Sequence, residues 1–452
     1  MTNILFHSFN AFLISVIALL IGKKLNLTDF QKYMFSLSSG FIFLTAPSHT
    51  ESVSWISGRT DVVATCFCLF SFAMYVAYKN YNKTYLLIIS SVLFFAALCS
   101  KECVIFYPAL IFLYELYLNY PCKHIRKVLP VPCLYGFLFA LYMLIRYIQL
   151  GTFIGGYGTG VHLNFIPFKI IQNIILYPVI SILPPLYDSI HAITFSCLFF
   201  MIIIIYSCIF FLKHKELKGT AIFLIISAAI SILPAANLLP LPGIYHTDTQ
   251  GQRFLYLPSS FTALYTGFLL SCIRCNKKIV TTLCMSFLII LAAFLYSTNK
   301  NWEEASRIAE NIISNMEQFD KSERLFMANL PDNFNGAYIY RNGFHHAIKL
   351  FRSELKSYKI NIILFNAMYD INEEILIESL EKPYTCRVIL TGKKSYFMNC
   401  NVPIEETFSN KYYDVPEFKD KSYILKFKKF TSDDRLVIYS AGRLINVSSI
   451  HR

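Results

Sequence analysis

The sequence predicts an all-α polytopic membrane bundle of about ten to eleven spans, followed by a C-terminal soluble α+β domain. Of the 452 residues, 55% are hydrophobic and only 15% charged, whereas soluble domains carry about 25% charged residues. Apolar stretches of the length that crosses a bilayer, about 17 to 25 residues, recur up to residue 297. These observations exclude a single soluble domain, and the aromatic content excludes a disordered chain.

Ten apolar stretches define the expected spans. They cover residues 4–21, 33–48, 61–78, 84–99, 103–118, 129–148, 192–212, 219–236, 254–271 and 278–297. A further segment, 168–186, is interrupted by Pro178, Pro184 and Pro185, which lack the amide donor that a helix interior requires. We expect that segment to be a broken span, a re-entrant piece or an interfacial helix.

The charge distribution predicts the domain boundary and the orientation. Residues 1–297 contain 19 Lys and Arg against 8 Asp and Glu, while residues 298–452 contain 22 against 20. If the N-terminus starts outside, fourteen of the 19 basic residues fall on one side of the membrane, as the positive-inside rule requires of the cytoplasmic side. We therefore expect a membrane domain at 1–297 and an extracytoplasmic soluble domain at 298–452. Because topology explains the basic excess, no nucleic-acid partner is expected.

The C-terminal domain shows short β-branched or aromatic runs bounded by turn residues. The expected strands are 325–329, 360–365, 387–390, 422–427 and 435–439, with a helix over 336–353. Cys386 and Cys400 are its only cysteines. They form either one disulfide or two free thiols.

Ionisable residues on the expected outer side mark a candidate site. Three segments concentrate them, 46–61, 100–102 and 234–258, the last of which includes His246 and Asp248. Charges near the hydrocarbon boundary are costly unless they are paired or face a water-filled cavity. The candidate catalytic residues are Glu51, Asp61 and Glu102, and the candidate phosphate- or substrate-binding residues are His49, Arg59, Lys101, Arg253 and Tyr256.

The residue types suit transfer from a phosphorylated lipid to a hydroxyl group. Arg and Lys bind phosphate, and a carboxylate can accept the proton of the hydroxyl. Two pairs of these residues also have a purely structural interpretation. Arg59 and Asp61 flank a helix start, and Lys101 with Glu102 forms a polar turn. The cysteines show no metal-ligand spacing, and a divalent metal at the carboxylates remains open. We expect His7 and Asn10 to hydrogen-bond a neighbouring helix.

Three motifs in this order resemble a known family. They are His49 to Asp61; Ser100-Lys101-Glu102 with Pro108 and Glu115; and Leu238-Leu239-Pro240 followed by Arg253 to Ser259. Over about 290 residues they resemble the membrane core of the transmembrane and TPR repeat-containing O-mannosyltransferases and their bacterial relatives. The resemblance implies a C-type superfold glycosyltransferase that moves sugar from a polyprenyl-phosphate carrier to a protein or glycan hydroxyl on the extracytoplasmic face, surrounded by membrane lipid.

The chain departs from that family in three respects. The family's catalytic acid, usually Asp, is expected in a loop before its second span, and this sequence begins at that span. Gln252 stands where the family commonly has an acid before the Arg, and the C-terminal region lacks the 34-residue period of tetratricopeptide repeats. The resemblance therefore implies either a transferase whose first span and loop lie upstream or an inactive relative.

Other interpretations remain open at this stage. An oligosaccharide polymerase or ligase would use outer Arg and His residues without an essential carboxylate. A lipid-carrier transporter would show inverted repeats and ionisable residues near the bilayer midplane, and a non-catalytic membrane assembly protein would need neither. We expect a multi-pass protein of a bacterial inner membrane rather than of the endoplasmic reticulum.

Overall fold

The computed structural model describes most of the chain. The described residues are 1–121, 125–153, 166–184, 190–236, 251–319, 324–340, 343–352, 359–381, 384–398 and 407–448. Contacts divide the protein into two compact units, Met1–Thr298 and Asn299–Arg452. The motif Leu238-Leu239-Pro240 and the residues His246, Asp248 and Cys400 lie outside the described residues.

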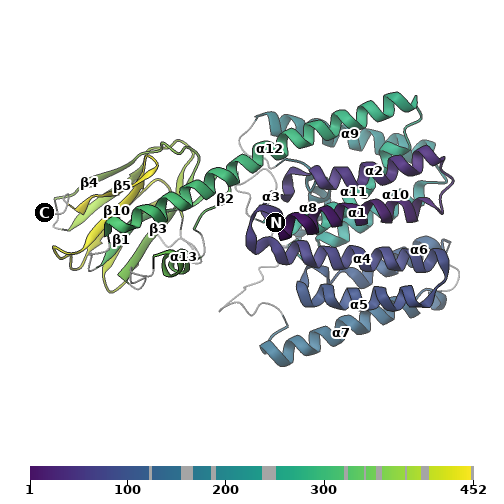
Figure 1. The fold of residues 1–452 in the computed structure, drawn as a ribbon, viewed down its shortest axis with the longest axis horizontal. Coiled ribbons are helices and arrows are strands. Elements are labelled where there is room, and N and C mark those ends of the chain that lie inside the picture. The colour runs from purple at the N-terminus through teal and green to yellow at the C-terminus, as the bar shows by residue number, and fades with distance from the viewer. Residues whose placement is uncertain are drawn as a thin grey trace. The chain divides into compact units, whose positions relative to one another are not determined.

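The first unit is a bundle of helices that lie side by side and roughly parallel or antiparallel to one another, horizontal in the view of Figure 1. Its helices are α1 (Thr2–Gly22), α2 (Asp29–Thr45), α3 (Thr50–Ser54), α4 (Arg59–Tyr81), α5 (Thr84–Ser100), α6 (Tyr107–Leu118), α7 (Pro130–Leu150), α8 (Pro167–Ile180), α9 (Ile190–Lys213), α10 (Lys218–Ile232), α11 (Tyr256–Ser271) and the first part of α12 (Lys277–Asn315), whose residues from Asn299 onward belong to the second unit. Short 3₁₀ turns lie between them: η1 (Pro47–His49), η2 (Ile56–Gly58), η3 (Glu102–Val104), η4 (Ile125–Lys127) and η5 (Gln252–Leu255). Each of the ten expected apolar stretches lies largely within a helix.

Among the residues that the structure describes, five helices are long and apolar enough to cross a membrane. They cover Thr2–Gly22, Ile56–Tyr81, Pro130–Leu150, Ile193–Lys213 and Lys277–Phe319. The expected ten to eleven spans are not supported. The remaining helices are shorter than the roughly 20 residues that a bilayer core requires: α2 and α5 have 17 residues each, α11 has 16 and α10 has 15.

Burial separates central helices from peripheral ones. In the most apolar window of Ile56–Tyr81, 72% of residues are buried, whereas Ile193–Lys213 has 11% and Lys277–Phe319 has 22%. Large exposed apolar surfaces of this kind are typical of helices that contact lipid or another protein. The aromatic rings of α9 and α12 pack together, with Phe199 and Phe287 stacked at 5.1 Å between ring centroids.

Small residues allow the central helices to approach closely. A Cβ atom at Gly40 of α2 would lie 2.9 Å from the Ala11 carbonyl oxygen of α1, and one at Gly267 of α11 would lie 2.8 Å from the Ser39 amide nitrogen of α2. The Ser36 hydroxyl donates to the Ser15 carbonyl oxygen of α1 at 2.9 Å. Close contact through Gly and Ser is how helices associate where water provides no hydrophobic driving force.

The interrupted segment forms α8, which contains Pro178 and ends at Ile180. The Pro178 carbonyl oxygen accepts hydrogen bonds from the hydroxyls of Ser181 and Thr262, at 2.8 and 2.6 Å. These hydroxyls pair with a backbone carbonyl in the last turn of α8, where no further helical N–H follows to bond to it.

The second unit contains two sheets. Its strands are β1 (Leu325–Phe334), β2 (Ala337–Tyr338), β3 (Ile360–Met368), β4 (Ile375–Ser379), β5 (Thr385–Leu390), β6 (Tyr396–Met398), β7 (Phe408–Ser409), β8 (Tyr413–Lys419), β9 (Ser422–Phe427), β10 (Arg435–Ser440) and β11 (Arg443–Asn446). One sheet has the order β11-β10-β1-β3-β6, with β2 paired to β1, and the other has the order β4-β5-β9-β8-β7. In the first sheet, β1 pairs in parallel with both β3 and β10.

Alternating side chains of β1 pack on two cores. Leu325 and Met327 contact the C-terminal part of α12, η6 (Met316–Phe319) and the helix α13 (Phe344–Phe351), while Phe326 and Ala328 face the second sheet. The unit therefore has three layers: helices, a mixed sheet and an antiparallel sheet. Its central strand is buried on both faces, as expected for parallel pairing.

The five expected strands are confirmed as β1, β3, β5, β9 and β10. The expected helix over 336–353 is wrong at its start. Asn335 and Gly336 have positive φ angles of 46° and 78°, and the Asn333 side-chain oxygen accepts the Gly336 N–H at 3.0 Å. This turn carries the chain from β1 into β2, so the helix begins only at Phe344. The Cys386 thiol is free and buried, and burial raises its pKa to about 12.

Candidate functional site

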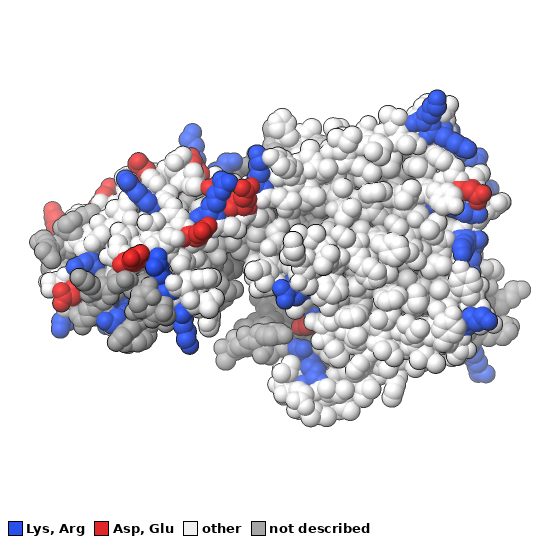
Figure 2. All heavy atoms as spheres, viewed as in Figure 1, with Lys and Arg blue, Asp and Glu red and all other residues white. Residues whose placement is uncertain are grey.

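Most of the expected site residues gather at one end of the helical unit. This end, which we call the polar end, comprises residues 46–61, 100–106 and 251–256. The opposite end, the basic end, comprises residues 22–32, 79–84, 213–218 and 272–278. Figure 2 shows Lys and Arg side chains gathered at the basic end, on the right of the view, while the flank of the bundle carries almost no charge. The two ends are thus separated by an apolar band.

Glu51 and Arg253 form the first pair at the polar end. Glu51 lies in α3 and is fully buried. Its Oε2 accepts the backbone N–H of Arg253 at 3.1 Å, and its Oε1 lies 3.8 Å from the Arg253 Nε. A buried carboxylate is costly unless it is paired. Glu51 therefore holds the turn η5 in place and keeps a guanidinium group at the start of α11.

Asp61 and Lys101 form the second pair. Asp61 lies in the first turn of α4, where the helix dipole favours a negative charge, and its side chain is 4% exposed. The Lys101 Nζ, which follows the end of α5, lies 2.5 Å from the Asp61 Oδ1. The helix-start role that the sequence suggested for Asp61 and its role as a partner of Lys101 therefore coexist.

An aromatic ring joins the two cations. The Lys101 Nζ lies 5.6 Å from the centre of the Phe254 ring, and the Arg253 Cζ lies 5.1 Å from it. The Arg253 Cζ also lies 4.9 Å from the Trp55 ring. The Arg253 and Lys101 side chains remain 30% and 20% exposed. Two positive groups that each lie over the same ring and are each paired with a buried carboxylate can bind a phosphate group.

Histidine and tyrosine side chains pack behind this pair of cations. The Tyr256 hydroxyl lies 2.8 Å from the His7 Nδ1 and accepts a hydrogen bond from the Asn10 amide at 3.2 Å. The His49 Nε2 lies 2.7 Å from the Ser259 hydroxyl. His49 is 1% exposed and Tyr256 is 0% exposed. Burial, together with the neighbouring His7 ring, lowers the pKa of His49 well below its usual range.

These contacts hold His49 and Tyr256 inside the bundle. A fully buried, neutral imidazole and a buried phenol contact helices α1, α2 and α11 rather than water. The expectation that His7 and Asn10 hydrogen-bond neighbouring helices is confirmed. The sequence could not show that their partner is Tyr256, which lies about 250 positions away in the chain.

Glu102 differs from the other two candidate carboxylates because it is partly exposed. Its side chain is 47% exposed and lies 3.9 Å from the Arg146 Nη2, while the Arg146 side chain is 7% exposed. Arg59, the first residue of α4, is exposed. Among the described residues, no group of three or more His, Cys, Asp or Glu side chains is arranged to bind a metal ion.

We compared the chain with family models, curated proteins and solved structures, and none of them matches it.

Proposed function

We propose that the protein is a membrane glycosyltransferase that moves a sugar from a polyprenyl-phosphate carrier to a hydroxyl acceptor at the polar end. The observation that carries this proposal is the convergence of Arg253 and Lys101 on the Phe254 ring. Their exposed hydrogens would bind the phosphate of the donor, while Trp55 and Phe254 would contact the neighbouring isoprene or sugar.

The three candidate carboxylates then divide into two roles. Glu51 and Asp61 are buried and already engaged by Arg253 and Lys101, so they hold the phosphate-binding cations in position. Glu102 is partly exposed and lies in the turn that immediately follows Lys101. We assign to it the role of general base, with Arg146 as its neighbour.

In the proposed reaction, Glu102 accepts the proton of the acceptor hydroxyl, and the oxygen of that hydroxyl attacks the anomeric carbon of the sugar. The bond between this carbon and the phosphate oxygen breaks, and its electrons remain on the departing polyprenyl phosphate. Arg253 and Lys101 stabilise the negative charge that develops there, which is the usual means of accelerating such a departure.

The proposal includes an orientation. With the basic end in the cytoplasm, the positive-inside rule is satisfied, and the polar end and the C-terminal unit are extracytoplasmic. The shorter helices α2, α5, α6, α10 and α11 would then cross as well, giving ten spans in a bacterial inner membrane. Their polar groups are buried in the bundle, as with Ser38 and Ser39 of α2, so they do not face lipid.

The test separates donor binding from catalysis. We expect Arg253→Ala to weaken binding of polyprenyl phosphate by about tenfold or more, since a hydrogen bond to a charged group contributes about 1.5–3 kcal/mol. We expect Glu102→Gln to leave binding unchanged and to lower transfer from polyprenyl-phosphate mannose, or another hexose of a donor panel, by roughly a hundredfold or more. Lys83→Ala, at the basic end, is the control and should change neither.

Arg253→Ala and the amide variants of all three candidate carboxylates distinguish the main alternative. A polymerase or ligase without an essential carboxylate would lose activity in Arg253→Ala and retain it in the amide variants of Glu51, Asp61 and Glu102. Unchanged polyprenyl phosphate binding in a correctly folded Arg253→Ala protein would contradict both interpretations.

A further inference from the structure

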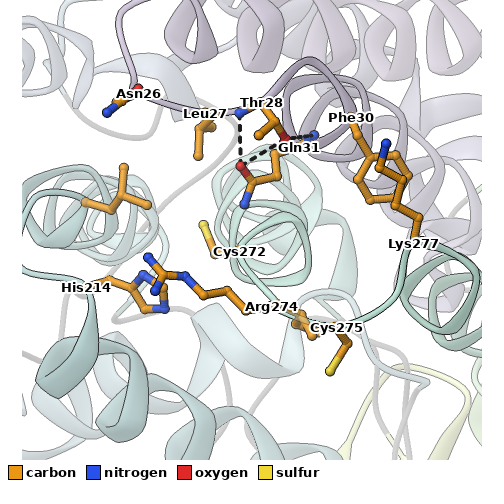
Figure 3. A pocket seen from close by; sticks show the side chains of 12 residues that line it. Asn26, Leu27, Thr28, Phe30, Gln31, His214, Cys272, Arg274, Cys275 and Lys277 are labelled. Carbon is orange, nitrogen blue, oxygen red and sulfur yellow. Dashed lines mark hydrogen bonds between the residues drawn. The ribbon is translucent and has the colours of Figure 1, made fainter.

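A cavity of about 350 Å³ lies at the basic end of the helical unit. It is bounded by the connection into α2, the connection between α9 and α10, and the connection between α11 and α12 (Figure 3). Its polar lining comes from Asn26, Thr28, Gln31, His214, Arg274 and Lys277. Its volume is at the lower end of the range of small-molecule sites, about 300–1,000 Å³.

The lining carries positive charge without a compensating acid. Arg274 extends towards His214 in Figure 3, and Lys277 lies beside Phe30, with its Nζ 5.4 Å from the ring centre. None of the described residues that line the cavity is Asp or Glu. The nearby Asp29 points to Lys32, with 3.7 Å between its Oδ1 and the Lys32 Nζ, and is not part of the lining.

The polar groups of the cavity also suit an anion. The Gln31 side-chain oxygen accepts hydrogen bonds from the Thr28 amide and hydroxyl, at 3.0 and 3.1 Å, so its NH₂ group is left to donate. His214 stacks on Phe210 at 4.8 Å between ring centroids. Burial, followed by the charges of Arg274 and Lys213, lowers the pKa of His214. A bound anion would offset the repulsion among these groups.

Apolar side chains in the same cavity indicate the source of the anion. Leu27, Phe30, Leu217 and Ile273 line it together with the polar groups, at the edge of the uncharged band. A free phosphate would gain nothing from such contacts, whereas a phospholipid places glycerol and the start of its acyl chains beside its phosphate. Basic pockets between membrane helices bind anionic headgroups in this way.

We propose that this cavity binds the phosphate headgroup of an anionic phospholipid, with Arg274 and Lys277 as its main contacts. The site is at the opposite end of the bundle from the candidate transferase site, and the inference does not depend on the proposed transferase activity.

The test uses the full-length protein in detergent and measures bound phosphatidylglycerol and phosphatidylcholine by native mass spectrometry. The affinity of the double variant Arg274→Gln/Lys277→Gln for phosphatidylglycerol should fall by roughly tenfold or more, because each basic residue contributes substantially to anionic lipid binding. The matched control is Lys83→Gln/Lys278→Gln, which removes the same charge at the same end but outside the cavity. The control should bind like the unmodified protein, and Arg274→Lys should retain binding.

Three results would overturn the proposal. One is an equal loss of phosphatidylglycerol binding in the two double variants, which would reflect general surface charge. Another is equal affinity of the unmodified protein for phosphatidylglycerol and phosphatidylcholine. The third is displacement of phosphatidylglycerol by millimolar inorganic phosphate, which would identify free phosphate as the ligand. Circular dichroism establishes that each variant is folded. The lipid comparison and the phosphate competition use the unmodified protein and need no variant.

Discussion

Arg324 and Asp434 show how a buried charge is accommodated in the C-terminal unit. The Asp434 side chain is 0% exposed. Arg324 donates to both of its oxygens, from Nε at 2.8 Å and from Nη2 at 2.5 Å, and the Thr431 amide donates to Oδ2 at 2.7 Å. Burial raises the pKa of Asp434, but the Arg324 and Thr431 hydrogen bonds outweigh it, and the pKa lies below its usual value.

A lowered carboxyl pKa makes stability depend on pH in a defined direction. The ion pair stabilises the folded unit fully when the pH is above the pKa of Asp434 in the unfolded chain, about 3.9. This stabilisation is lost as the pH falls through the lower pKa of Asp434 in the folded unit. At pH 7, Asp434→Asn should destabilise the unit by about 3 kcal/mol, because it leaves Arg324 without its charge partner. Hydrogen exchange of the β1 and β10 amides in the full-length protein, corrected for intrinsic rates, measures this loss.

The difference in unfolding free energy between Asp434→Asn and the unmodified protein should be constant above about pH 5. It should shrink as the pH is lowered through the range in which carboxyl groups titrate. Ser432, in the same turn, is the control position: Ser432→Ala should change the unfolding free energy little at any pH. A difference that stays constant down to the lowest pH would contradict the assigned pKa direction.

The sequence identified individual charged residues as candidates for the site, but not the residues with which they pair. Glu51, Lys101 and Arg253 stand out as charged residues at the ends of apolar stretches. Their pairing depends on helices that are far apart in sequence, as does the pairing of Arg324 with Asp434 across 110 positions. The different burial of Glu51 and Glu102 likewise comes from packing: both follow apolar helices in the sequence, but only Glu51 is covered by η5.

Helices α2 and α11 depend on a glycine at their closest approach. We expect Gly267→Ala to destabilise the helical unit by about 1–3 kcal/mol, the usual cost of overpacking, because the new Cβ would lie 2.8 Å from the backbone nitrogen of Ser39. Thermal unfolding of the purified protein in detergent measures the effect.

Gly136 of α7 is the matched control, since a Cβ atom there would meet no atom within 4 Å. Gly136→Ala should be neutral or should stabilise the helix by up to about 1 kcal/mol. Equal unfolding temperatures for the two alanine variants would show that α2 and α11 do not pack as described.

Element types were more predictable than element boundaries. Long apolar stretches predicted the ten principal helices, and β-branched runs predicted five strands. Strands such as β8 escaped prediction because Pro416 and acidic residues interrupt its apolar pattern, which disfavours a strand assignment from sequence. The length of α2 could not be judged from hydropathy alone, because its serines are polar yet buried against α1 and α11.

For the molecule as a whole, the main prediction concerns sidedness. A cysteine introduced at Ser57, which is exposed at the polar end, should react with a membrane-impermeant maleimide added outside intact cells. A cysteine at Lys83, exposed at the basic end, should react only after permeabilisation. Peptide mass spectrometry distinguishes the added thiols from the native ones.

Reaction of both positions from the same side of an intact membrane would contradict the orientation. The reverse labelling pattern would place the candidate transferase site in the cytoplasm and would exclude an extracytoplasmic acceptor. The charge asymmetry in the sequence predicted the two ends, but the burial of individual helices, from which the lipid-facing helices are identified, required the three-dimensional structure.

The parallel pairing of β1 with β10 has a consequence for protein synthesis. Leu325 pairs with Arg435, so the ribosome must add 110 residues after Leu325 before its partner is made, which takes about 5–20 s at common translation rates. During that interval one side of β1 is an open strand edge, which is prone to aggregation. A nascent chain of this protein would therefore benefit from a chaperone until β10 has been made, and truncations before residue 435 should accumulate as insoluble or degraded material.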